Sequence, residues 1–148
     1  PDFKHICNEG MVHRLPKVNH PVYYGGPVLT NVVGVLHSTD FILTSTNTLT
    51  EDKVGFTLDR KMLEVIARGD GPKNMMITLG MANWTTGQLE EELEHPRSPA
   101  MSWLIMDYDE KFVFGQLDDD KPDDLWESCV SQAIRNKTKE ITGKIFKS

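Results

Sequence analysis

The segment Leu79–Leu93 constrains the fold of this 148-residue chain more than any other part of it. The run Met75–Leu79 that leads into it is apolar except for one threonine, which is typical of an interior strand buried on both faces. Small residues follow, and then Thr85 and Gln88 have the spacing of a capping box. Because Pro96 disfavours a helical residue before it, the helix must end at about residue 94. A buried strand therefore turns directly into a capped helix.

Shorter patterns predict the strands that precede this segment. Alternating apolar and polar residues, or short β-branched runs, are typical of strands, and glycine and proline mark the turns between them. We expect strands at Val22–Tyr24, Val32–His37 and Val54–Leu58, and either a strand or an extended loop at Phe41–Thr46.

Two further helices are indicated by residues that suit helix ends. Asp59 can cap a helix whose apolar residues recur at helical spacing, and Gly69 supplies its stop. Asp124 and Glu127 again have capping-box spacing, and the basic residues that follow suit the end of a last helix. Between these helices we expect a surface loop at His95–Ser102, a hairpin of strands at Trp103–Met106 and Phe112–Phe114, and an acidic turn at Asp118–Asp120.

Composition excludes several classes of protein. The net charge of −6 and the pI of about 5.3 disfavour direct binding to nucleic acid or to anionic lipid. No apolar run approaches the ~20 residues needed to cross a bilayer, so we expect no membrane association. The first residues lack the apolar core of a signal peptide, and Cys7 and Cys129 form no metal-binding or redox motif. We therefore expect a cytoplasmic protein with reduced thiols.

Three groups of residues resemble the YqgE/AlgH family, whose members are uncharacterised or regarded as transcriptional regulators. The first, Pro21–Val28 followed by Gly34–His37, is similar to the family's PV-x-x-GGPV and F-x-LH segments. The second is the opening segment, similar to LGYAGW-x-x-GQLE-E-E-L. The third is Trp103-Leu104, then Phe112–Phe114, leading to Trp126. The resemblance implies a single α+β domain over residues 1–148 with a mixed, mostly antiparallel, curved sheet and packed helices.

The resemblance covers about residues 21–130, and the chain departs from the family pattern at several places. Met81 stands where an aromatic residue is usual, and Asn83 where a small one is usual. The loop His95–Ser102 is longer than the family's. The family's N-terminal, glycine-led strand is not clearly present before Val18, so one sheet edge is expected to be open to a second copy of the chain.

No complete catalytic or metal-binding motif occurs, so no catalytic residue is predicted. The glycine pattern fits neither a phosphate-binding loop nor a dinucleotide fingerprint, and no G-x-S-x-G elbow or H-E-x-x-H helix is present. The glutamates after Gln88 are expected to form a solvated helix face. Four residues near the N-terminus invite a metal interpretation, but their spacing fits no zinc pattern: His5, Cys7, His13 and His20. We expect neither a metal nor a cofactor.

A candidate pocket remains where strand ends and a helix start could meet. Ligands of α/β folds bind at the carboxyl ends of strands and near helix N-termini. Each residue also has a purely structural interpretation: a tight turn at the glycines, a strand-end histidine bonded to backbone, and a core tryptophan that fixes the junction. The candidate residues are Gly25, Gly26, Pro27, His37, Asn83, Trp84, Gly87 and Gln88.

Three functions stay open at this point. The resemblance implies a regulatory or interaction protein without established catalysis, acting through an unknown protein or small-molecule partner. The first alternative is a small-ligand-binding protein or enzyme that uses the candidate pocket. The second is a structural module that functions as a homo-oligomer and completes its sheet across chains.

Overall fold

The computed structural model of the protein describes residues 2–7, 16–97, 103–114 and 124–145. These residues fall into two compact units, Pro1–Asn83 and Trp84–Ser148, and the boundary lies inside the stretch that we expected to form one continuous domain. The expected acidic turn at Asp118–Asp120 lies outside the described residues. No helix among the described residues has both the length and the apolar character needed to span a membrane.

The first unit is built on a five-stranded mixed sheet with the order β1-β5-β2-β4-β3. Only β1 and β5 pair in parallel, and the other neighbours are antiparallel. The mixed, mostly antiparallel α+β fold is therefore confirmed. The strands are β1 (Val22–Tyr24), β2 (Val28–Ser38), β3 (Asn47–Leu49), β4 (Val54–Thr57) and β5 (Met75–Met81).

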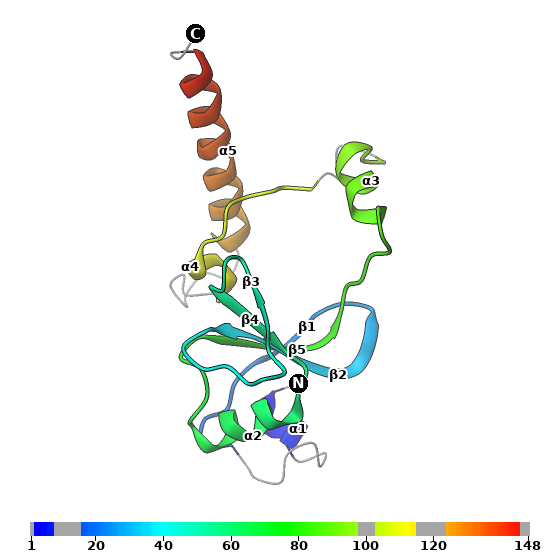
Figure 1. Cartoon of the computed structure of the whole chain (residues 1–148), viewed down its shortest axis with the longest axis vertical. Coiled ribbons are helices and arrows are strands. Elements are labelled where there is room, and N and C mark those ends of the chain that lie inside the picture. Colours follow the sequence, from blue (N-terminus) through cyan, green and yellow to red (C-terminus); the bar gives the residue numbers. More distant parts are fainter. Residues whose placement is uncertain (1, 8–15, 98–102, 115–123, 146–148) are drawn as a thin grey trace. The chain divides into compact units, whose positions relative to one another are not determined.

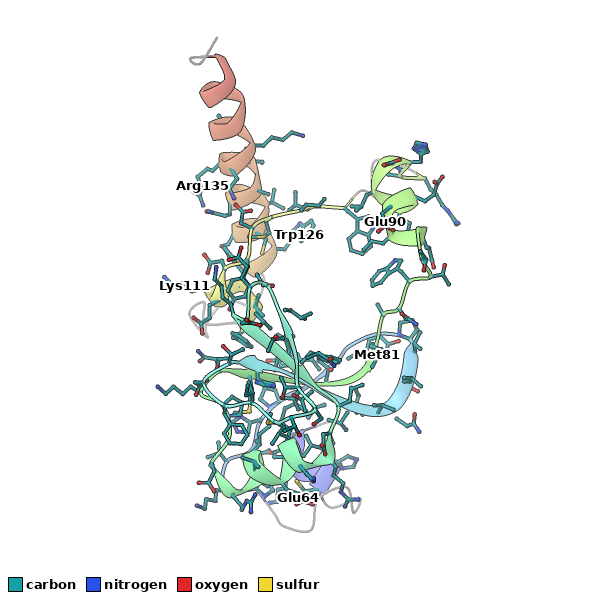
Figure 2. The ribbon with its side chains drawn as sticks, in the orientation of Figure 1. Glu64, Met81, Glu90, Lys111, Trp126 and Arg135 are labelled. Atoms are coloured by element: carbon teal, nitrogen blue, oxygen red, sulfur yellow. The ribbon has the colours of Figure 1, made fainter. Side chains whose placement is uncertain are left out.

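The link between β1 and β2 is barely long enough for the distance that it has to span. The two strands are consecutive in sequence, yet they lie on opposite sides of β5 and are joined only by Gly25–Pro27. Strands two places apart in a sheet are separated by about 10 Å. Because three extended residues also reach about 10 Å, the link has to cross directly over the end of β5. Figure 2 labels Met81, the last residue of β5.

The hydrophobic core lies between the sheet and two helices on one of its faces (Figure 1). The helix α2 (Arg60–Arg68) contributes four of its buried residues to this core, and its ends match the expected ones. The carboxylate of Asp59 accepts from the amide of Lys61, and Gly69 ends the helix in the left-handed conformation. The core comprises Phe3, Ile6, Cys7, Val22, Val33, Val35, Met62, Leu63, Ile66, Ala67 and Ile77.

The helix α1 (Phe3–Ile6) contributes to this core, although no pattern in the sequence predicted it. Phe3 is fully buried, and its amide donates to the carbonyl of His20, just before β1. Asp2 caps the helix and also binds the side chain of Asn19. A helix of four residues is too short to show helical periodicity, so its apolar residues carried no recognisable pattern.

The structure decides between the two alternatives for Phe41–Thr46. This segment is a loop, because the hydroxyl of Thr46 accepts from the amide of Leu43 and the amide of Thr46 donates back to the carbonyl of Leu43. The opposite face of β5 is only partly covered, so this strand is not buried on both faces; Met76 and Thr78 are half-buried there. β2 also extends further than expected, with an irregularity between Val28 and Val33 at which the strand curves (Figure 1).

The second unit contains helices and extended backbone. Its helices are α3 (Gln88–Glu94), α4 (Glu110–Val113) and α5 (Asp124–Ile145). The expected hairpin is wrong: residues 103–109 form no strand, and a helical turn follows. The reason lies in Asp109, whose carboxylate accepts from the amide of Lys111 and starts that turn as an N-cap. Figure 2 shows Lys111 on α4, and Trp126 and Arg135 on α5.

We expect Phe3→Ala to lower the free energy of unfolding by about 3–5 kcal/mol, because it leaves a cavity in a core that α1 helps to close. The control is Ile42→Ala, at a side chain that is 54% exposed, with an expected change of at most about 1 kcal/mol. Urea unfolding followed by circular dichroism measures both. Equal effects of the two substitutions would show that α1 does not belong to the core.

Candidate functional site

The glycines of the predicted pocket form a close backbone crossing. The amide of Gly25 donates to the carbonyl of Leu79 at 2.8 Å, which continues the pairing of β1 with β5. A Cβ atom added to Gly25 would lie 2.2 Å from the carbonyl oxygen of Gly80, and one added to Gly80 would lie 2.4 Å from that of Gly26. Gly80 also has a φ of +73°. These positions need glycine because the link passes over the end of β5 without room for side chains.

His37 is completely buried and makes a hydrogen bond through each ring nitrogen. Its Nδ1 lies 2.9 Å from the carbonyl oxygen of Ser38, and its Nε2 lies 2.9 Å from Oγ1 of Thr57. Thr57 is itself buried and shares a 2.8 Å hydrogen bond with the hydroxyl of Thr46. Because a carbonyl can only accept, Nδ1 donates to Ser38, and in the neutral imidazole Nε2 then accepts from Thr57. The imidazole thus links β2, β4 and the loop before β3.

A second group of polar residues follows His37 at the end of β2. The hydroxyl of Ser38 donates to the carboxylate of Asp40 and lies 3.1 Å from the amide nitrogen of Asn74. The amide of Lys73 also donates to Asp40, at 3.2 Å. The hydrogen bond from Ser38 lowers the pKa of Asp40 most, and the amide of Lys73 lowers it further. This group ties the end of β2 to the turn before β5.

The glycine crossing and His37 lie at opposite ends of β5. Val28, which follows the crossing, pairs with Met81, whereas His37 pairs with Met75 at the start of β5. Six residues of strand separate these two positions, which corresponds to about 20 Å. The structure therefore does not bring His37 to the glycine turn.

Four candidate residues lie at the boundary between the units or beyond it. Asn83 is the exposed last residue of the first unit, whereas Trp84, Gly87 and Gln88 belong to the second. The side-chain oxygen of Gln88 accepts from the amide of Thr85 at 3.1 Å, as the capping box requires. The helix nevertheless begins at Gln88, because Gly87 occupies the N-cap in the left-handed conformation and Thr85 lies outside it.

Trp84 packs against Trp103, a contact that the sequence did not predict. Their ring centroids are 5.7 Å apart and the rings meet at 66°, edge to face. The Nε1 atoms of Trp84 and Trp103 donate to the same oxygen of Glu92, at 3.5 and 3.2 Å. The second oxygen of Glu92 accepts from Gln88 at 3.4 Å. We call Trp84, Trp103 and Glu92 the indole–carboxylate cluster.

A cavity of about 550 Å³ lies beside this cluster in the second unit. Gln88 is the one candidate residue that lines it, and Glu92 belongs to both the cavity and the cluster. The sequence signal for Glu92 was its helical spacing from Gln88, whereas nothing in the sequence pointed to Trp103 as its neighbour. The lining residues are Gln88, Glu91, Glu92, His95, Pro96 and Arg97.

The fold and these sites define a small mixed α+β protein in which the buried His37 has a role in packing. The chain belongs to the AlgH-like family, whose sequence model matches residues 3–137 and so spans both units. The family resemblance of the sequence is thereby confirmed.

Relatives and one solved structure agree with this assignment. A UPF0301 protein of a Bradyrhizobium strain is 39% identical over 102 residues, which cover 69% of this chain and 45% of the relative. One of Rickettsia akari is 37% identical over 112 residues, covering 74% and 53%. The chain thus spans about half the length of the curated relatives it matches. The solution structure of AlgH from Pseudomonas aeruginosa aligns with a TM-score of 0.69 at 27% identity, over 96% of this chain and 70% of that one.

The glycine crossing predicts a large penalty for any side chain at residue 80. We expect Gly80→Ala to destabilise the first unit by about 2–5 kcal/mol, since the methyl group adds a backbone clash to the cost of a positive φ. Gly69→Ala is the matched control: its φ is +83°, but only the flexible Lys17 side chain lies near, at 3.5 Å. It should cost about 1–2 kcal/mol. Similar midpoints of urea unfolding for both variants would refute a steric requirement at the crossing.

The hydrogen bonds of Asp40 predict a dependence of stability on pH. Because its pKa is lowered in the folded state, the carboxylate adds stability above the unfolded pKa of about 3.9 and loses it as the pH falls through the lower folded value. Asp40→Asn should therefore reduce stability at pH 7 and flatten the loss of stability below about pH 4. Asp70→Asn, at an exposed position, serves as the control. Thermal unfolding from pH 2.5 to 7 measures both variants. If Asp40→Asn loses stability below pH 4 as steeply as the wild type, Asp40 is not the group responsible for that loss.

Proposed function

We propose that the protein is a non-catalytic interaction protein with a regulatory role, and that its contacts are made by the extended segment Trp103–Ile105. One observation carries this proposal. Three consecutive large apolar side chains are exposed in this segment, with exposed fractions of 47% for Trp103, 39% for Leu104 and 73% for Ile105. Contiguous apolar exposure of this kind is typical of contact surfaces.

The environment of His37 supports a role without catalysis. A general base must be able to take a proton from a substrate within hydrogen-bond reach. The imidazole has no exposed surface, and its ring nitrogens are already bonded to Ser38 and Thr57. Proton transfer to a substrate would require these bonds to break inside the core.

The proposed first partner is a second copy of the chain. Residues 103–108 lie outside the strands of this structure, so this extended segment can form a new ladder with a second strand. Two such segments can pair antiparallel about a two-fold axis, so that each covers the apolar side chains of the other. This arrangement unites the interaction and oligomer hypotheses.

Direct DNA binding is not part of the proposal, and neither is a membrane partner. The acidic charge of −6 opposes binding to phosphate, so a gel-shift assay with duplex DNA should show no complex at about 150 mM salt. Tight binding that weakens steeply with added salt would overturn this view. We also propose a cytoplasmic location, which the unpaired Cys7 and Cys129 support.

A small-ligand-binding function is the second candidate, favoured by the cavity beside α3. Its volume of about 550 Å³ lies in the usual range for ligand sites, and one candidate residue, Gln88, lines it. Gly25, Gly26 and His37 support the first unit by packing and hydrogen bonding, and Pro27 is an exposed residue of the same link. The ligand-binding proposal therefore centres on the second unit.

We expect the wild-type chain to sediment as a dimer at high micromolar concentration and Ile105→Lys to sediment as a monomer, because a buried lysine in each strand would cost more than the pairing provides. Ile42→Lys, at an isoleucine that is 54% exposed in a loop of the first unit, should remain dimeric. Analytical ultracentrifugation measures all three proteins. A wild-type protein that is monomeric at high micromolar concentration would refute the proposed self-association.

A further inference from the structure

The indole–carboxylate cluster combines two features that organic cations bind. Trp84 and Trp103 meet edge to face, and Trp103 is 47% exposed, so part of its ring surface is open to solvent. The negative faces of indole rings attract cations within about 6 Å of the ring centroid. The Glu92 carboxylate lies at the edges of both rings and adds a full negative charge.

The hydrogen-bond partners of Glu92 leave its charge without a cation. Its oxygens accept from the indole nitrogens of Trp84 and Trp103 and from the Gln88 amide, and all three donors are neutral. Within the part of the chain that the structure describes, no lysine or arginine forms an ion pair with Glu92. Arg97 lines the neighbouring cavity but forms no ion pair with Glu92. A carboxylate held in place by neutral donors is prepared to receive a positive ligand.

We propose that Trp84, Trp103 and Glu92 form a binding site for a small alkylated ammonium ion, such as a quaternary ammonium group. Such an ion is weakly hydrated and apolar at its surface, so it contacts indole faces at little desolvation cost. A metal ion suits the cluster poorly, because divalent cations require several oxygen or nitrogen ligands. Among the described residues no three histidine, cysteine, aspartate or glutamate side chains gather to provide them.

This inference deepens the ligand-binding candidate and rests on it, and it shares only Trp103 with the proposed self-association surface. The cluster uses Trp84, Trp103 and Glu92, whereas the test of self-association uses Ile105. Ile105→Lys should therefore still bind the cation. If the chain dimerises but does not bind the cation, the cation site is refuted. If it binds the cation but does not dimerise, self-association is refuted.

The experiment is a fluorescence titration with choline and with 3,3-dimethyl-1-butanol, its neutral isostere. Both are added to the Trp126→Phe variant, which keeps the two tryptophans of the cluster and removes the remaining one, a residue 67% exposed on α5. We expect choline to change the emission saturably with a Kd on the order of 1–10 mM, and the neutral isostere to bind at least about tenfold more weakly.

Substitutions then assign the contributions of the side chains. Glu92→Gln keeps the shape and should weaken choline binding about five- to tenfold, whereas Glu90→Gln, at an exposed residue of the same helix that does not line the cavity, should change it less than about twofold. Trp103→Leu should abolish the saturable change. Equal binding of choline and the isostere, no saturation in the parent variant, or full affinity in Glu92→Gln would each overturn the proposal.

Discussion

The contact between the backbones of Gly26 and Gly80 is the constraint on which the first unit depends. It allows a three-residue link to pass over the end of β5, and β5 can therefore occupy the space between β1 and β2. The position of β5 between β1 and β2 in turn places Ile77 in the core with residues of α1 and α2. A side chain at this crossing would push the link away and open the sheet where its parallel and antiparallel pairings meet.

The same constraint gives these prominent glycines a role in the fold. A turn rich in glycine can present amides to an anion, but here the amide of Gly25 is bonded to Leu79 and the space around Gly80 is filled by backbone. His37 has a comparable role at the other end of β5, where its two hydrogen bonds join β2 to β4. The most distinctive residues of the first unit thus serve its architecture, and the chemistry that remains accessible lies in the second unit.

Sequence reasoning succeeded where local chemistry determines structure. Asp59 and Gly69 define the ends of α2 through interactions with their immediate neighbours, and the mixed α+β class follows from short strands between helices. Sequence reasoning failed where contacts between residues far apart in the chain determine the structure. The order of the strands, which separates His37 from the glycine turn, depends on pairings across the chain, and no local pattern reports that register. The neighbours Trp84 and Trp103 were likewise brought together by a fold that propensity alone does not describe.

The position of β5 also has a consequence for how the chain folds. β1 and β2 leave the ribosome one after the other, but they cannot form a hairpin, because the strand that belongs between them is made much later, as the pairing of Val22 with Ile77 shows. Both strands must wait with unsatisfied edges, and the loop closures that complete the sheet are long. Folding should therefore be slow for a unit of this size, and nascent chains interrupted before Met75 should be prone to aggregation.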